Sequence, residues 1–145
     1  MSEQAVRVYV ADKIRALEVG VVHERNKLPK TSGEFKALFE YDGKVQGWVV
    51  TFSGIGSSRT DANFLKIPET YRVVTFFGFN NEYDTETEFG TSLRTVYKML
   101  SNDRTLGGTV ANVTEVSVPE ISLVKVGEIF SHYAEIHIAT ESFES

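Results

Sequence analysis

Hydrophobic and polar positions along this chain change their period several times, and each change marks the border of an expected element. From Val6 to Val21, apolar residues recur every three or four positions with charged residues between them. This is the spacing of one helix face, so it predicts an amphipathic helix over about residues 4–18. A polar stretch without period follows at residues 23–33 and predicts a loop.

Two β-rich runs within residues 35–54 meet at Asp42-Gly43. Both residues of this dipeptide readily adopt positive φ, as the type I′ turn of a tight hairpin requires, so we expect a β-hairpin here. Residues 55–70 are polar and without period, which predicts a long connection of the kind that is often functional. Residues 71–79 are dense in aromatic and β-branched residues and predict a third strand.

A second helix is expected in the second half of the chain. Thr85 and Glu88 fit the capping box that starts a helix, and the apolar positions after them keep helical spacing over about residues 86–101. Three β-rich runs follow, at residues 110–118, 121–129 and 132–140. Pro119 suits a turn or an edge strand because it cannot donate to a ladder.

The order of these elements predicts the fold class. Helix, hairpin, strand, helix and further strands indicate an α+β protein with one domain over residues 1–145. We expect a mainly antiparallel sheet of roughly four to six strands packed by two helices.

Composition narrows the class of protein. With 145 residues, of which 41% are hydrophobic and 24% charged, the chain can form one ordered domain with its own core. Cysteine is absent, which excludes thiol nucleophiles, disulfides and thiolate metal sites. The net charge is −5 and the 15 Lys and Arg are spread along the chain, which argues against a clamp for nucleic acid. The chain shows neither a signal-peptide pattern nor a long apolar run, so we expect a protein made in a cytoplasm.

The stretch NDRTLGGTV at residues 102–110 contains two adjacent glycines, as a phosphate-binding loop or a simple turn would. It follows the C-terminus of the predicted helix, where the dipole repels anions, and it lacks the Gly-Lys-Ser/Thr of a P-loop. We therefore predict that Leu106, Gly107 and Gly108 form a structural turn, with at least one glycine at positive φ.

Other candidates for chemistry also have structural interpretations. Four carboxylates lie close together, at Glu82, Asp84, Glu86 and Glu88. Their spacing lacks the features of a calcium loop, whereas the start of a helix stabilises negative charge. His132 and His137 lie an odd number of residues apart in a predicted strand, so they point to opposite faces and would not share a metal. We predict no catalytic residue, no cofactor and no metal, and hence a protein that is not an enzyme.

Between about residues 89 and 140, the helical run FGTSLRTVYKML is followed by the turn SNDRTLGGTV, then by a valine-rich strand and then by GEIFSHYAEIHIAT. This order resembles the C-terminal half of bacteriophage tail terminator (tail completion) and related neck proteins. Leu106, Gly107 and Gly108 match the family's turn, and its closing strand is matched by three residues, Ala134, Ile136 and Ile138. The earlier GWVVTF and YRVVTFFGFNNEYDTETEF are also similar to parts of some phage proteins, so the resemblance begins at about Phe35.

The resemblance implies a structural virion protein, located in the tail or neck after assembly in the bacterial cytoplasm. Its subunits would form a ring, usually a hexamer, that caps the tail tube, stops tube polymerisation and joins the tube to the neck. The implied partners are copies of the chain, the tail tube protein and a neck or head-completion protein, with DNA passing through the lumen without specific binding. A head–tail joining protein is the alternative within this class. A small-molecule-binding or enzymatic α+β domain is the alternative outside it.

Charged residues suggest where subunits of such a ring would meet. Basic residues occur in the two predicted loops, at Arg25, Lys27, Lys30, Arg59 and Lys66. They could pair between subunits with the acidic cluster of Glu82, Asp84, Glu86 and Glu88 and so set the register of assembly. The alternative is that both groups are simply solvated.

Overall fold

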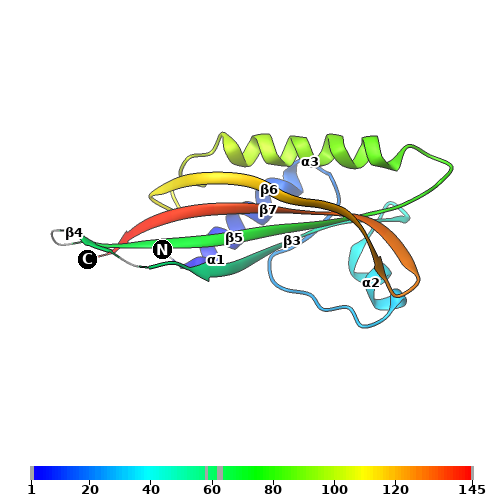
Figure 1. Cartoon of the computed structure of the whole chain (residues 1–145), viewed down its shortest axis with the longest axis horizontal. Coiled ribbons are helices and arrows are strands. Elements are labelled where there is room, and N and C mark those ends of the chain that lie inside the picture. The colour runs from blue at the N-terminus through cyan, green and yellow to red at the C-terminus, as the bar shows by residue number, and fades with distance from the viewer. Residues whose placement is uncertain (1, 58, 62–63, 145) are drawn as a thin grey trace.

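One long, mainly antiparallel sheet organises the structure (Figure 1), a computed structural model that describes residues 2–57, 59–61 and 64–144. In chain order the elements are α1 (Glu3–Ala16), β1 (Val21–His23), α2 (Ser32–Phe39), β2 (Glu40–Tyr41), β3 (Lys44–Ile55), β4 (Arg59–Asp61), β5 (Phe64–Gly78), α3 (Thr85–Ser101), β6 (Asn112–Val126) and β7 (Ile129–Glu144). The α+β class expected from the order of elements is confirmed.

The strands run in the spatial order β1-β3-β5-β7-β6. Every neighbouring pair along this path is antiparallel except β1 with β3, which is parallel. Two short strands are added to it: β2 pairs with β3, and β4 pairs with β5. The long central pair β5–β7 keeps one continuous register from Leu65–Glu144 to Gly78–Ser131. This pair is therefore the central axis of the sheet, beside which the other strands are placed.

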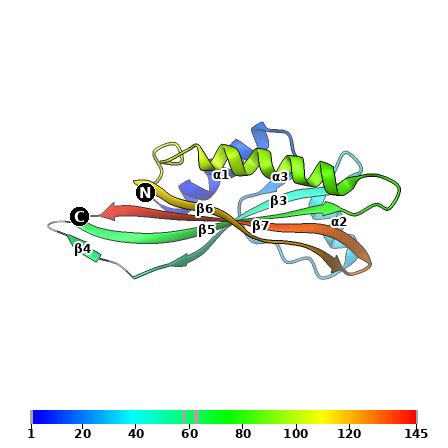
Figure 2. The same cartoon turned by 45° about the horizontal axis from the view of Figure 1, so that its top comes forward.

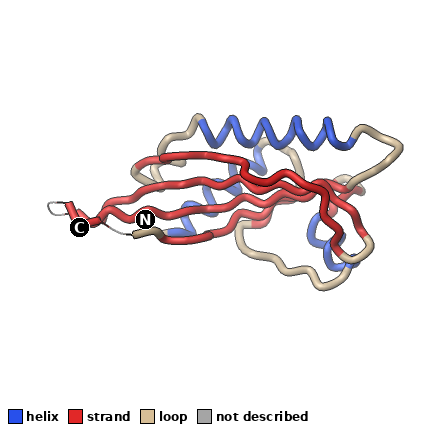
Figure 3. Tube along the Cα trace, viewed as in Figure 1, coloured by secondary structure: helices blue, strands red, loops and turns tan. Residues whose placement is uncertain are grey.

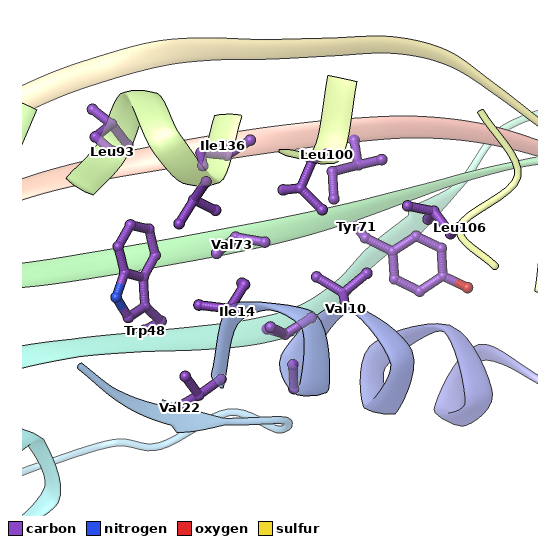
Figure 4. Packing of buried hydrophobic residues seen from close by; sticks show 14 of the residues in the cluster. Val10, Ile14, Val22, Trp48, Tyr71, Val73, Leu93, Leu100, Leu106 and Ile136 are labelled. Carbon is purple, nitrogen blue, oxygen red and sulfur yellow. The ribbon is translucent and has the colours of Figure 1, made fainter. Parts of the chain in front are cut away.

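Helices α1 and α3 cover one face of the sheet, and α2 covers part of the other face (Figures 1 and 2). The main core contains the apolar stripes of α1 and α3 and the alternate residues of β3, β5 and β7. Figure 4 shows Val10 and Ile14 of α1 and Leu100 of α3 close to Val73 and Ile136 of the sheet. Each such side chain stabilises the fold by about 1.5–3 kcal/mol when fully buried.

Helix α2 corrects the expectation of a strand in the first part of residues 35–54. Thr31 caps the helix by accepting a hydrogen bond from the backbone N–H of Glu34 at 3.1 Å. Phe35 and Phe39, one helical turn apart, then both pack on Phe76 of β5, with ring centroids 5.1 and 5.2 Å away. Only the second half of the expected hairpin is a long strand. The turn itself has the expected geometry, with φ of 51° at Asp42 and 78° at Gly43.

The expectation of a loop over residues 55–70 is wrong for most of its described part. Strand β5 begins at Phe64, and β4 pairs with it from Arg59 to Asp61. Residues 58 and 62–63 of the expected loop lie outside the described residues. The polar sequence here forms strands because β7 continues beside β5 as far as Glu144 and supplies the hydrogen-bonding partners.

The two runs at residues 110–118 and 121–129 form one strand, β6, and not two. The register shifts between Ser117 and Glu120, so Pro119 lies in an irregularity of the ladder and does not end the strand. β6 is the last strand on its side of the sheet, in agreement with the expected edge position of this proline.

One end of the sheet extends past α1 and α3 (Figure 3). This projection, called the arm below, consists of β4, the end of β3 at Gly54–Ile55, residues 64–69 of β5 and residues 140–144 of β7. The C-terminal end of β7 lies in the arm, whereas α3 begins at the opposite end of the molecule (Figure 1).

Candidate functional site

The glycine turn after α3 joins that helix to α1. Leu106, Gly107 and Gly108 have φ of 45°, 66° and 86°, so both glycines have the positive φ that the sequence predicts. A Cβ atom on Gly107 would lie 2.2 Å from a ring carbon of Tyr9. The Tyr9 hydroxyl donates to Asp103 Oδ2 at 2.6 Å, and Asp103 Oδ1 accepts from the Gly107 N–H at 3.2 Å. These contacts assign the turn a packing role.

The acidic cluster lies at the N-terminal end of α3. Asp84, and not Thr85, is the capping residue: it accepts from the Thr87 N–H at 3.0 Å and from the Thr87 hydroxyl at 2.8 Å. These two hydrogen bonds lower the pKa of Asp84. The Thr85 hydroxyl is instead hydrogen-bonded to His132 Nε2 of β7, at 2.8 Å. Glu82, Glu86 and Glu88 are exposed to solvent.

The histidines do not meet. His132 lies on the helix-bearing face, where its ring stacks on Phe89 at 5.3 Å, and burial lowers its pKa. His137 lies on the opposite face with its Nε2 at 2.9 Å from Glu135. Within the described ranges, no group of three or more His, Asp or Glu side chains is arranged to hold a metal ion.

Glu135 is the centre of a polar network on the face opposite α1 and α3. Its carboxylate accepts from the Tyr133 hydroxyl, contacts His137, and lies 3.3 Å from Arg72 Nε of β5. Burial would raise the pKa of Glu135, but these three partners together hold it below its ordinary value. The strand pattern places Tyr133, Glu135 and His137 on one face, whereas Arg72 joins them only through the register of β5 with β7. The network acts as a polar contact between strands, although Arg72 Nε, buried at ion-pair distance from Glu135, makes no hydrogen bond.

The basic residues predicted at a subunit interface occupy different parts of the molecule. Arg25 lies in the loop after β1, and Lys66 lies in the arm, where its Nζ pairs with Glu141 at 3.0 Å. The backbone of Arg59 belongs to β4, but its side chain lies outside the described part of the chain. The arm and the acidic cluster lie at opposite ends of the molecule (Figure 1), so Lys66 could meet Glu82 or Glu88 only in another copy.

Exposed apolar side chains gather at two places that sequence reasoning missed. In the arm, Ile55 is 62% exposed and Leu65 37%. Beside α3, Ile121 and Leu123 of β6 and Phe130 of β7 are each more than half exposed. The register places Ile121 opposite Ala134 and Leu123 opposite His132, so this second group, called the β6–β7 patch, faces the same side as α3. The alternating pattern of these strands suggests that the three residues are buried. They are exposed because α3 does not cover this part of the sheet, which the sequence pattern does not show.

Two hollows accompany these surfaces. One of about 340 Å³ lies between α3 and β6, next to the β6–β7 patch, and is lined by Leu93, Tyr97 and Ile121 among others. The other, of about 570 Å³, lies where β5 ends and is lined by Phe77, Phe79 and Tyr83 together with polar residues. Most of the aromatic strand at residues 71–79 is used for packing: Tyr71 and Val73 are fully buried in the core.

Comparison with known proteins gives no family assignment, since no protein-family model and no curated protein matches the chain. In the described part of the chain, none of the helices combines the length and the apolar character that crossing a membrane requires.

Proposed function

We propose that this protein is a structural subunit of a phage virion, forming a ring that caps the tail tube, ends its polymerisation and joins it to the neck. The observation that carries the proposal is the presence of unlike exposed apolar surfaces, the arm and the β6–β7 patch, on one rigid sheet. Exposed apolar groups of this kind mark contact sites. A closed ring needs two different surfaces on each subunit, and a ring that also caps a tube needs a further surface for its partner.

The sequence resemblance supports the more specific role in the tail. The segments that carry it include α3, the glycine turn and β7, which pack on one another around Ala134, Ile136 and Ile138, all fully buried. The partners under this proposal are copies of the chain, the tail tube protein and a neck protein. The net charge of −5 suits a subunit past which DNA moves, because like charge repels phosphate.

Two measurements test the proposal. Light scattering and electron microscopy of the purified chain should reveal a closed ring, and adding the chain to polymerising tail tube protein should shorten the tubes and leave rings at their ends. A head–tail joining protein would instead bind the portal complex and leave tube length unchanged. A chain that stays monomeric and binds neither partner would contradict the proposal.

The hollow of about 570 Å³ favours a second candidate, a small-molecule-binding domain. Its lining combines the rings of Phe77, Phe79 and Tyr83 with the charged side chains of Lys44 and Glu88, which is the usual mixture of a ligand pocket. A monomer whose melting temperature rises with a compound from a metabolite library would favour this candidate. Replacing Phe79 by alanine should then abolish the rise without changing the oligomeric state.

A further inference from the structure

Residues 25–30, called the basic loop below, combine positive charge with an exposed apolar side chain. Leu28 is 87% exposed, the largest exposure among the exposed large apolar side chains of the described residues. Arg25, Lys27 and Lys30 surround it in sequence, and no ion pair between described residues involves any of the three. The loop borders a hollow of about 380 Å³ against α1, where Arg7 and Arg15 are already paired with Glu3, Asp12 and Glu24. The surface therefore presents unpaired positive charge around an apolar side chain.

The complementary surface is present in the arm. Ile55 lies opposite Glu69 in the ladder of β3 and β5, and Leu65 lies opposite Glu144 in the ladder of β5 and β7. Leu65 and Glu69 are four residues apart on one strand, so all four side chains share the helix-bearing face, called the acidic arm face below. Burial, together with the nearby carboxylates of Glu144 and Glu3, raises the pKa of Glu69. Negative charge is thus gathered beside exposed apolar side chains, where a cation would stabilise it.

We infer that the acidic arm face of one copy docks on the basic loop of a second copy, with Leu28 packed against Ile55 while Arg25 and Lys27 meet Glu69 and Glu144. The inference rests on the proposed ring and specifies which surfaces close it. The arm lies at one end of the molecule and the loop runs beneath the other half of the sheet (Figure 1), so the two meet only between copies. Such a head-to-tail contact closes into a ring when its rotation permits.

The chemistry favours a second copy over nucleic acid as the occupant of the basic loop. A phosphate group would pair with the cations of the loop but would gain nothing from contact with the apolar side chain of Leu28. In addition, DNA repels a chain whose net charge is −5. The acidic arm face offers both the carboxylates and the apolar contact. In the acidic cluster at the start of α3, by comparison, Asp84 is already engaged as a helix cap.

Disulfide trapping tests the contact directly, since the chain contains no cysteine. Leu28→Cys and Ile55→Cys are prepared separately and mixed under mild oxidation. We expect a cross-linked pair in the mixture and much less in either variant alone. Lys36→Cys, at an exposed position of α2 just after the loop, mixed with Ile55→Cys is the matched control and should remain uncross-linked.

Charge reversal tests the energetics of the same contact. Lys27→Glu and Glu69→Lys should each weaken self-association by about tenfold, and combining them in one chain should restore most of the loss. Lys36→Glu and Glu128→Lys, reversals at exposed sites outside both surfaces, should leave association unchanged.

The outcomes separate this inference from the proposed function. Rings that form without the cross-link and are insensitive to both reversals would overturn the docking and leave the ring intact. A wild-type chain that neither associates nor cross-links would overturn both. If Lys27→Glu abolished binding to a fluorescent duplex DNA without affecting assembly, the basic loop would be assigned to nucleic acid and the docking rejected.

Discussion

At Gly107 the local geometry leaves little choice of side chain. Its φ is 66°, and a Cβ there would lie 2.2 Å from the Tyr9 ring, whereas Gly108, at φ 86°, has open space around it. Gly107→Ala should therefore lower the free energy of unfolding by about 3 kcal/mol, through strain and overpacking together. Gly108→Ala should cost only about 1 kcal/mol, for strain alone. Urea denaturation of the two variants measures both values, and equal losses would show that the contact with Tyr9 does not matter.

His132 makes the stability of the fold depend on pH. Burial against Phe89 lowers its pKa in the folded state, so the fold favours the neutral ring. Its contribution is present above the unfolded pKa of 6.5 and is lost as the pH falls through 6.5 toward the lower folded value. Between about pH 7 and about pH 5, the melting temperature of the wild type should fall more than that of His132→Gln. Parallel pH profiles for the two proteins would contradict this assignment.

At the scale of elements, α2 shows how tertiary packing decides between helix and strand. Phe39 is almost fully buried, and its ring lies 5.2 Å from Phe76 across the face opposite the main core. Phe39→Ala should lower the free energy of unfolding by about 3–5 kcal/mol, because it removes a buried ring and leaves a cavity. Phe130→Ala, which removes a ring that is more than half exposed, should change it by about 0.5 kcal/mol or less. Calorimetry on both variants checks the contrast.

Elements with strong local signals could be predicted from the sequence, and those that depend on partners could not. The helical spacing of apolar residues in α1 and α3 and the turn dipeptide Asp42-Gly43 are signals within a few residues of sequence. They were sufficient to predict the two helices and the turn. The early half of β5 is polar, and it is a strand only because β7 runs beside it to Glu144. Likewise Pro119 suggests an end to β6, yet the strand passes through it with a shift of register.

The candidate surfaces were less predictable than the elements for a related reason. Basic residues of the loop are visible in the sequence, but the complementary acidic arm face combines β3, β5 and β7 and exists only through their register. The β6–β7 patch has the alternating pattern of a core strand, and nothing local shows that α3 leaves it uncovered. The sequence therefore shows which residues are charged, but not which residues of other strands lie beside them in the fold.

At the scale of the whole molecule, the proposed function needs one set of surfaces for contact between subunits and another for contact with the tail tube. The acidic arm face and the basic loop are complementary, so together they account for the contact between neighbouring subunits. The β6–β7 patch has no complementary surface of this kind, and its residues Ile121 and Leu123 lie on β6, an edge strand whose outer side carries no other strand of the described sheet. An exposed apolar group beside a free strand edge suits contact with a second protein, which under the proposed function would be the tail tube protein.

Separating the two tasks by mutation gives the last prediction. Leu123 is 58% exposed, so Leu123→Asp should change the free energy of unfolding by about 0.5 kcal/mol or less. Because a charge in the β6–β7 patch opposes burial against a partner, this variant should still form rings but should no longer shorten growing tail tubes. Leu28→Asp is the matched control: it places the same charge at the centre of the basic loop, where it should impair ring formation itself. Light scattering measures ring mass and electron microscopy measures tube length. If Leu123→Asp capped tubes as well as the wild type, the patch would not be the tube-binding surface, and the arm or the acidic end of α3 would have to take its place.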